Sequence, residues 1–231
     1  MLTNHRRAFW YSIGLLGACV LSLVVVGRHP PSVAPATTVP IVGRFDASMY
    51  TWMDDIRNTP TTVLARALNF VGGGVVTIPL RAAASLILLL RRRWRQLSAF
   101  ILTWVASETL LAVMKAYFHR GRPPGALVST SGYSFPSGHA VASAATAVAL
   151  VLVFLPPGHD RRTWEWIAVA FVFVMALSRV YLDAHWFSDA VAGVLLGAGI
   201  AFGAAALSTE VWTLLRRSSQ QPIASGTLPA R

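Results

Sequence analysis

The sequence predicts an all-α, polytopic membrane protein with six transmembrane helices and an amphipathic helix at the outer surface. Three observations lead to this class. Apolar residues make up 55% of the 231 residues and charged residues only 13%, about half the charged share of a typical soluble domain. Apolar runs of about 20 residues, the length that crosses a bilayer, recur along the chain. Arginines cluster at the ends of these runs. The composition excludes a disordered chain and a coiled coil and argues against a soluble globule.

The six predicted spans are helical, because a backbone in lipid has to satisfy its hydrogen bonds internally. They cover residues 8–27, 68–90, 97–117, 139–155, 164–182 and 189–215. The second is interrupted by three glycines at 72–74 and by Pro79, and it carries Arg81, while the third carries Glu108. The fourth is short for a span, and residues 136–138 could extend it by a turn.

The predicted organisation begins with a cytoplasmic N-terminus at 1–7 and a retained anchor at 8–27. A cleaved signal peptide is the alternative, but the uncharged run exceeds the usual apolar region of about 7–15 residues. Residues 28–67 form an extracytoplasmic linker and an interfacial helix over 44–67, whose apolar residues recur at helical spacing, namely Phe45, Met49, Trp52 and Ile56. Residues 68–215 form a core of five transmembrane helices, and 216–231 form a disordered cytoplasmic tail.

The arginine distribution predicts the orientation and accounts for the net charge of +11. Clusters at 6–7, 91–95, 161–162 and 216–217 belong to one set of loops, and the arginines of the other set are spread over many more residues. The positive-inside rule then places both termini of this multi-pass cell-membrane protein in the cytoplasm. Because the clusters flank apolar runs, the charge does not indicate nucleic-acid binding. The single cysteine, Cys19, allows no intrachain disulfide.

Three short stretches with reactive side chains fall on the predicted outer side. They are residues 115–123 at the end of the third span, 136–139 at the start of the fourth, and 178–189 across the turn between the fifth and sixth. Together they supply basic, imidazole and carboxylate groups, which are Lys115, Arg122, His139, Arg179, His185 and Asp189. We therefore expect one site at the outer face of the bundle.

The basic residues and the start of the fourth span are typical of a site that binds a phosphoryl group. Lys115, Arg122 and Arg179 can neutralise phosphate oxygens, and arginine can do so with two parallel hydrogen bonds. Ser137 and Gly138 lie where a helix begins, and a helix N-terminus favours an anion. These residues therefore predict a phosphate cradle.

The two histidines add the chemistry. His139 lies in the first turn of the fourth span, over the predicted anion site. His185 and Asp189 are four residues apart, so on a helix they share a face. A carboxylate beside an imidazole fixes its tautomer and stabilises its cation. This arrangement suits a histidine nucleophile, which becomes positively charged when it is phosphorylated.

These stretches resemble the type 2 phosphatidic acid phosphatase superfamily of lipid phosphate phosphatases, whose active site is similar to that of vanadium haloperoxidases. The family pattern is Lys-x6-Arg-Pro, then Pro-Ser-Gly-His, then Ser-Arg-x5-His-x3-Asp. The chain matches it at every position, with Lys115, Arg122, Pro123, Pro136, Ser137, Gly138, His139, Ser178, Arg179, His185 and Asp189. The resemblance covers residues 45–212 and departs at Asp183, where the family often has glycine.

The resemblance implies a role for each matching residue. His185 would be the nucleophile that takes the phosphoryl group, and Asp189 would orient it. His139 would protonate the leaving oxygen and then activate water. The phosphate cradle would consist of Lys115, Arg122, Ser137, Gly138 and Arg179. No metal and no cofactor are implied, because three cationic side chains replace the divalent ion of other phosphoryl-transfer sites.

The residues and the resemblance together predict an integral-membrane enzyme that hydrolyses a lipid phosphate or diphosphate through a phosphohistidine on the extracytoplasmic side. Phosphatidate, phosphatidylglycerol phosphate, undecaprenyl diphosphate and other polyprenyl phosphates are candidate substrates taken from the membrane. A phosphotransferase with the same intermediate is an alternative. A transporter or a structural membrane bundle is an alternative from another class. The oligomeric state stays open.

The sequence also suggests two ion pairs that the family pattern does not include. Arg81 and Glu108 lie about ten and eleven residues from the cytoplasmic ends of their spans, so both lie ~15 Å deep. An isolated charge at that depth costs about 2.5–3.5 kcal/mol. We therefore expect Arg81 and Glu108 to pair, on the face of the third span that leads to Lys115. Asp183 follows Arg179 by four residues and could pair with it.

Overall fold

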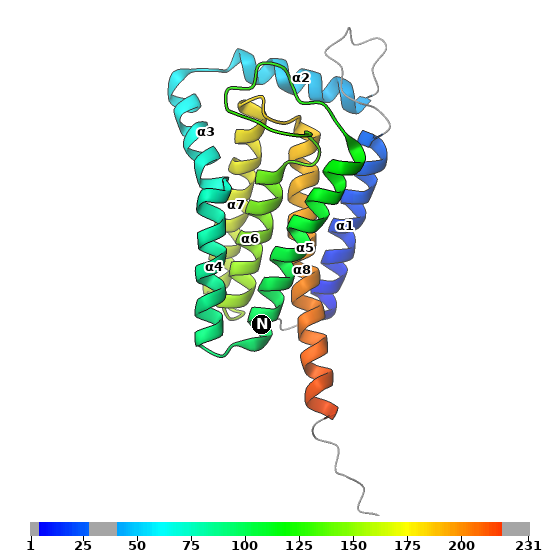
Figure 1. The fold of residues 1–231 in the computed structure, drawn as a ribbon, viewed down its shortest axis with the longest axis vertical. Coiled ribbons are helices and arrows are strands. Elements are labelled where there is room, and N and C mark those ends of the chain that lie inside the picture. Colours follow the sequence, from blue (N-terminus) through cyan, green and yellow to red (C-terminus); the bar gives the residue numbers. More distant parts are fainter. Residues whose placement is uncertain (1–4, 28–40, 219–231) are drawn as a thin grey trace, which may run out of the picture.

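The structure, a computed structural model, describes residues 5–27 and 41–218, in which every regular element is a helix (Figure 1). The helices are α1 (His5–Gly27), α2 (Ile41–Asp55), α3 (Thr59–Gly72), α4 (Gly74–Leu90), α5 (Trp94–Phe118), α6 (Gly138–Phe154), α7 (His159–Tyr181) and α8 (Phe187–Ser218). All but α2 run along one bundle, and α2 lies across its end. The predicted all-α class is confirmed. The predicted linker at 28–40 and the tail from 219 onward lie outside the described residues.

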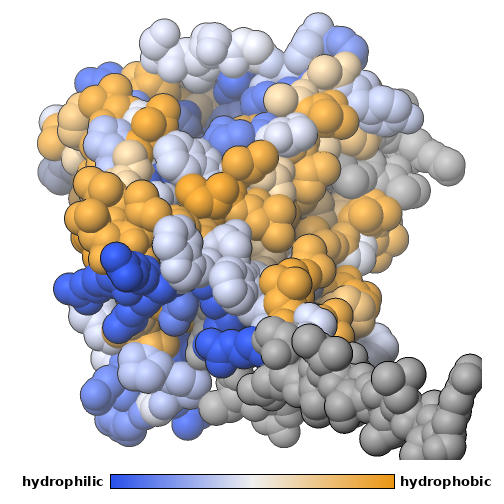
Figure 2. Space-filling model, turned by 60° about the horizontal axis from the view of Figure 1, so that its bottom comes forward, coloured by the Kyte–Doolittle hydropathy of each residue, from blue (hydrophilic) through white to orange (hydrophobic). Residues whose placement is uncertain are grey.

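Three described helices, α5, α7 and α8, are long and apolar enough to cross a membrane, and α3 with α4 is a fourth candidate if the bent pair forms one span. Helix α6 and residues 9–21 of α1 are apolar but shorter. Figure 2 shows an apolar band above a hydrophilic end of the bundle, where the turn from α4 to α5 exposes residues 91–93. The chain is thus a multi-pass membrane protein. Its six spans and its orientation stay predictions.

Two helix ends differ from the predicted boundaries. Helix α6 begins at Gly138 with Ser137 as its N-cap, so residues 136 and 137 do not add the expected turn. Helix α8 continues to Ser218, three residues into the segment predicted as a disordered tail. The second difference arises because Arg216 and Arg217 lie in the last turn of α8, where basic side chains interact favourably with the helix dipole.

The predicted helix over 44–67 is wrong in its extent, because α2 ends at Asp55 and a new helix, α3, begins at Thr59. Asn58 caps α3 by accepting a hydrogen bond from the Thr61 amide at 3.0 Å. Helix α3 then runs into the predicted second span and meets α4 at Gly73, with a bend of 43°. Gly73 is extended, with φ −75° and ψ 161°, so the backbone ladder is interrupted there.

The bundle buries a different face of α2 from the apolar stripe that the sequence places at the membrane interface. Phe45 and Trp52 are each 51% exposed, whereas Asp46 is 1% exposed and Met53 is 3% exposed. Phe45 retains one edge contact with Phe187 at the start of α8, with ring centroids 5.2 Å apart. Helix α2 therefore turns a carboxylate towards the bundle, where polar partners receive it.

Helix α8 packs closely on α6 through glycines, which let two helix backbones approach each other. A Cβ atom on Gly193 would lie 2.8 Å from the Ser137 carbonyl oxygen, so only glycine allows this approach. On another face of α8, a Cβ atom on Gly199 would lie 2.9 Å from the side chain of Leu16 in α1. The close packing brings the starts of α6 and α8 together, and the Ser137 amide donates to the Asp189 carbonyl at 3.0 Å.

The predicted ion pair between Arg81 and Glu108 is confirmed, with Nη1 of the arginine 2.5 Å from Oε1 of the glutamate. Arg81 is 2% exposed. Its Nε donates to Thr146 Oγ1 at 2.8 Å, and its Nη2 donates to the Ala142 carbonyl at 3.2 Å. One guanidinium thus joins α4, α5 and α6 on the face of α6 that also carries His139.

Candidate active site

The three motif stretches meet at the end of the bundle that α2 crosses (Figure 1). The segment between α5 and α6 folds back over the turn between α7 and α8. There the Ser134 amide donates to the Arg120 carbonyl at 2.8 Å, and the Leu127 amide donates to the Leu182 carbonyl at 3.0 Å. The end of α5, the start of α6 and the turn before α8 are therefore neighbours, as the motif positions predict.

His185 lies in the turn before α8 rather than on the helix, and it is 3% exposed. Its Nδ1 lies 2.7 Å from the Ser134 carbonyl oxygen. Because a carbonyl only accepts hydrogen bonds, Nδ1 carries the proton, and the Nε2 lone pair faces Nη1 of Arg122 at 3.2 Å. The fold thus leaves the Nε2 lone pair directed at a cationic side chain.

The electrostatic environment keeps this imidazole neutral. Burial lowers the pKa of His185 to about 4, with Arg122 and Arg179 adding to the decrease and Asp189 opposing it. At neutral pH the Nε2 lone pair is therefore free of a proton.

Asp189 lies beside His185, but its direct hydrogen bonds are to other groups. Its Oδ2 is 3.8 Å from Nδ1 of His185 and accepts from the Trp186 amide at 2.9 Å. The Ser134 hydroxyl donates to the same oxygen, and Arg120 donates to Oδ1. Ser134 thus connects the pair, because its carbonyl holds the imidazole and its hydroxyl holds the carboxylate.

Backbone carbonyls of the segment before α6 orient two of the predicted phosphate ligands. Arg122 donates to the carbonyls of Ser131 and Gly132 at 2.7 and 3.0 Å, and Lys115 donates to that of Tyr133. Burial lowers the pKa of Arg122 from its usual value. Because backbone carbonyls are neutral, they orient Arg122 and Lys115 without cancelling the positive charge of either side chain. Both cations therefore remain able to bind an anionic ligand.

Arg179 and Ser137 each contribute a polar atom that has no hydrogen-bond partner in the described part of the chain. Arg179 is 2% exposed, and its Nη1 donates to the side-chain oxygen of Asn69. Within the described residues, Nε of Arg179 and Oγ of Ser137 are buried and have no hydrogen-bond partner. Gly138 is the first residue of α6. Arg122 repels both Lys115 and Arg179, so an anion among these side chains would stabilise all three.

His139 lies in the first turn of α6, as predicted, and approaches the bend between α3 and α4. Its Nε2 donates to the Asn69 carbonyl at 3.1 Å, which leaves Nδ1 to bind and release a proton. A Cβ atom on Gly72 would lie 2.9 Å from the imidazole ring, so the interrupted span makes room for this histidine.

Four residues of the site were missed in the sequence, and they are Asp46, Asn69, Arg120 and Ser134. Asn69 is an amide inside an apolar run, a signal for a polar contact between helices that could have been used. Arg120 falls in the unspecified part of the first motif and resembles an ordinary loop arginine. The pattern around Asp46 and Ser134 carries no comparable signal, because their partners are distant in the sequence.

The suggested pair between Asp183 and Arg179 is wrong, because Asp183 Oδ2 instead lies 2.6 Å from Nη2 of Arg57. Arg57 lies between α2 and α3, so this ion pair connects the α2–α3 turn to the turn before His185. Asp183 has φ +51°, in the left-handed region that favours glycine. This backbone explains why glycine is common at this position in the family that the motifs resemble.

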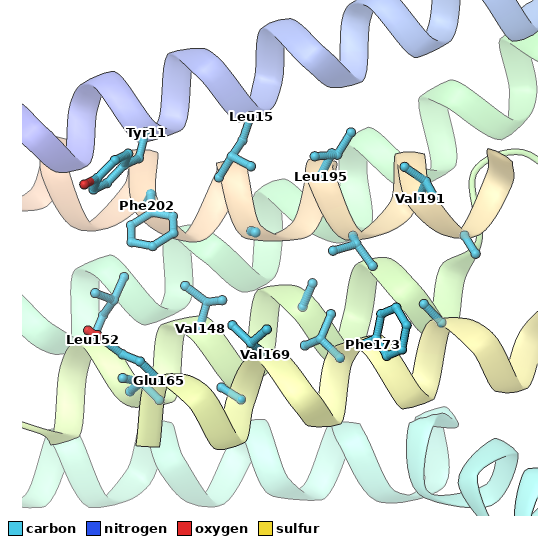
Figure 3. A pocket seen from close by; sticks show the side chains of 18 of the residues that line it. Tyr11, Leu15, Val148, Leu152, Glu165, Val169, Phe173, Val191, Leu195 and Phe202 are labelled. Atoms are coloured by element: carbon cyan, nitrogen blue, oxygen red, sulfur yellow. The ribbon is translucent and has the colours of Figure 1, made fainter. Parts of the chain in front are cut away.

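Two apolar cavities lie along the flanks of the bundle. One of about 840 Å³ lies between α1, α6, α7 and α8, where Val169 and Phe173 face Val191 and Leu195 (Figure 3). The other, of about 400 Å³, lies between α4, α6 and α7 and reaches Gly72. No group of three or more His, Cys, Asp or Glu side chains in the described part of the chain converges as metal ligands do. The groups that the motif site presents to a ligand are therefore cationic side chains and imidazoles.

Comparison with known proteins identifies relatives of this arrangement. Residues 96–212, just over half of the chain, match the family model described as the PAP2 superfamily. A protein of Sulfolobus acidocaldarius named undecaprenyl-diphosphatase is 32% identical over 144 residues, which cover 58% of this chain and 65% of that protein. A Mycobacterium tuberculosis protein named decaprenylphosphoryl-5-phosphoribose phosphatase is 35% identical over 141 residues, covering 59% of this chain and 74% of that protein.

A solved structure has the same fold. It is described as the first transmembrane PAP2 type phosphatidylglycerolphosphate phosphatase from Bacillus subtilis, and it superposes with a TM-score of 0.74 at 22% identity. The superposition covers 87% of this chain and 98% of that chain. The fold is therefore shared over nearly the whole solved structure, whereas the sequence match spans 65% of the Sulfolobus protein.

Proposed function

Since this chain belongs to the PAP2 superfamily, we propose that it is a membrane phosphatase that hydrolyses a lipid phosphate or diphosphate. One observation carries the proposal. Nε2 of the buried His185 carries its lone pair beside Arg122, while Nδ1 is held by the Ser134 carbonyl. A neutral imidazole in that position is prepared to attack a phosphorus atom held by arginines.

The phosphate would bind in the cradle of Lys115, Arg122, Ser137, Gly138 and Arg179. The unpartnered Nε of Arg179 and Oγ of Ser137 support this proposal, because a phosphate oxygen would satisfy both. The first amides of α6 add hydrogen-bond donors and the positive end of the helix dipole. Three cations then neutralise charge on the equatorial oxygens of the transition state.

The proposed reaction has two steps. In the first, Nε2 of His185 attacks phosphorus, the bond from phosphorus to the lipid oxygen breaks, and that oxygen takes a proton from Nδ1 of His139. In the second, water attacks phosphorus and gives its proton back to His139. The phosphorus–nitrogen bond breaks, inorganic phosphate leaves and His185 becomes neutral again. Asp189 stabilises the positive charge on the phosphorylated imidazole from 3.8 Å.

We propose that the site faces the extracytoplasmic side and takes its substrate from that leaflet. The arginine clusters at 91–95 and 161–162 lie at the opposite end of the bundle, which supports this orientation. The relatives are named for isoprenoid and glycerolipid substrates. The proposed substrates are therefore polyprenyl and glycerolipid phosphates or diphosphates.

The test is phosphate release by the purified full chain in detergent from undecaprenyl diphosphate, phosphatidate and phosphatidylglycerol phosphate. His185→Ala should lower the rate more than about a thousandfold. His139→Ala should also be slow and should accumulate a phosphoenzyme, because the base for the second step is gone. His159→Ala serves as a control, because that side chain is 94% exposed at the other end of α7.

Phosphate release by His185→Ala at the wild-type rate would contradict the mechanism. Transfer of the phosphoryl group to an added alcohol, without free phosphate, would identify a phosphotransferase instead. A cysteine replacing Gly125 should react with an impermeant thiol reagent in intact cells, while a cysteine replacing Gly158 should not. The reverse labelling would contradict the proposed orientation.

A further inference from the structure

Three buried charges continue from the proposed nucleophile towards the outer helix. Asp46 of α2, Arg120 of the segment before α6 and Asp189 of α8 are 1%, 5% and 0% exposed. Nη2 of Arg120 lies 2.7 Å from Oδ2 of Asp46, and Nη1 of the same guanidinium donates to Oδ1 of Asp189. One arginine therefore joins a carboxylate of α2 to the carboxylate beside His185.

Asp46 also fixes the first turn of α8. Its Oδ1 accepts from the Ser188 amide at 2.9 Å, and its Oδ2 accepts from the Ser188 hydroxyl at 2.6 Å. Asp189 reaches back to the Trp186 amide at 2.9 Å, as an acidic residue in the first turn of a helix often does. Two carboxylates from different helices therefore satisfy the first amides of α8, and both are held by Arg120.

The two arginines of the sequence Arg120-Gly121-Arg122 flank the His185–Asp189 pair. Arg122 contacts Nε2 of the imidazole, and Arg120 contacts the carboxylate. Because Arg120 engages Oδ1 of Asp189, the other oxygen, Oδ2, is left to face Nδ1 of His185 at 3.8 Å. Arg120 thus decides which carboxylate oxygen faces the nucleophile.

The charge of Asp46 matters to the reaction because Arg120 lies between two carboxylates. With Asp46 in place, the group of three has a net charge of −1, so Asp189 retains negative potential towards His185. Without Asp46, the Arg120 charge cancels that of Asp189, and the phosphorylated imidazole loses stabilisation. This effect is strong because all three groups are out of water, where charges interact over several ångströms with little screening.

We propose that Asp46 and Arg120 are positioning residues for phosphoryl transfer, which set the orientation and the residual negative charge of Asp189. The proposal rests on the proposed function, in which His185 becomes a phosphorylated cation. It gives α2 a part in the chemistry, although α2 lies outside the residues that match the family model. The side chains of Asp46 and Arg120 form hydrogen bonds with each other, with Ser188 and with Asp189, and none of these residues belongs to the proposed phosphate cradle. Substrate binding should therefore be independent of both.

The test compares kcat and KM of phosphate release for Asp46→Asn and Asp55→Asn. Both substitutions remove a carboxylate from α2, but Asp55 is exposed. Asp46→Asn should lower kcat roughly tenfold to hundredfold, as a misplaced catalytic group does, with KM within twofold. Asp55→Asn should leave both unchanged. Ser188→Ala removes the hydroxyl that donates to Asp46 and accepts from Arg120, but it keeps all three charges, so it should lower kcat less than Asp46→Asn.

Equal losses of kcat in Ser188→Ala and Asp46→Asn would overturn the proposal, because docking of α2 alone would then explain them. A wild-type kcat in Asp46→Asn would overturn it as well. If Asp46→Asn does not fold, Asp46→Glu decides, because it moves the same charge by one methylene group. A lower kcat at unchanged KM supports the proposal, and an unchanged kcat overturns it.

Absence of phosphate release by the wild type would overturn the proposed function and this inference together, whereas normal release by wild type and Asp46→Asn would overturn only the inference.

Discussion

Breaking the ion pair between Arg81 and Glu108 should destabilise the whole bundle, because the guanidinium connects three helices. Glu108→Gln removes the charge on Oε1, which lies 2.5 Å from the arginine, but it leaves the hydrogen bonds from Arg81 to Thr146 and Ala142. Removing one partner of a fully buried pair costs about 3–5 kcal/mol. Arg81 is 2% exposed but Glu108 is 51% exposed, so we expect a smaller loss of about 2–3 kcal/mol.

Arg81→Gln should cost about the same, because it leaves a carboxylate on an apolar flank. The double variant should then cost about 3 kcal/mol rather than the sum, which corresponds to a coupling free energy of about 2 kcal/mol. For a chain of this size, each single substitution should lower Tm by about 4–12 °C. Thermal unfolding in detergent, followed by tryptophan fluorescence, measures these shifts.

Glu165→Gln provides the matched control for this cycle. Glu165 also pairs with an arginine, with its Oε1 2.8 Å from Nε of Arg161, but the two lie one turn apart on the same helix. Such a local pair contributes at most about 1 kcal/mol, so this control should shift Tm by no more than a few degrees. Additive losses for Arg81→Gln and Glu108→Gln would refute the conclusion that these charges stabilise each other.

Three further predictions concern the site. Asn69→Ala removes the side-chain acceptor of Arg179 and should lower kcat/KM roughly tenfold to hundredfold; an unchanged value in steady-state assays would contradict the role of this contact. Asp183→Gly should change the free energy of unfolding by less than about 1 kcal/mol, because the gain from placing glycine at φ +51° offsets the loss of the pair with Arg57. Asp183→Val strains the backbone and also loses the pair, so in thermal unfolding it should cost about 2–3 kcal/mol more. The active form of His185 is neutral and burial lowers its pKa to about 4, so protonation of this residue should not reduce kcat/KM until the pH falls to near 4. In a pH–rate profile, a decline near pH 6.5, the value of an exposed histidine, would contradict the burial effect.

The sequence was informative where chemistry is local or where depth in the membrane can be counted. Lys115, Arg122, His139, Arg179, His185 and Asp189 could be found because their types and spacings form a pattern, and Arg81 with Glu108 because both lie at the same depth on adjacent spans. Successive spans cross the membrane in opposite directions, so counting the spans was enough to place all of these residues at the same end of the bundle.

The contacts between distant segments could not be predicted in the same way. Asp46 lies on a helix whose apolar periodicity, at Phe45 and Trp52, indicated a position at the membrane interface. That periodicity carried no signal for the face, with Asp46 on it, that packs on α7 and α8. The predicted partner of Asp183 was one turn away, but Arg57 reached it from the outer segment. Helical periodicity describes which residues share a face, and only the tertiary arrangement decides which face is covered.

The bend between α3 and α4 should make the activity depend on the thickness of the surrounding bilayer. Helices adjust to a thinner or thicker hydrocarbon core by tilting or bending, at a cost of fractions of a kcal/mol per ångström. The interrupted ladder at Gly73 is a point where this pair can bend. Asn69, one turn before it, holds both Arg179 and His139. A host membrane with shorter or longer acyl chains would therefore shift a phosphate ligand and the proton donor together, and lipid chain length would tune the turnover rate.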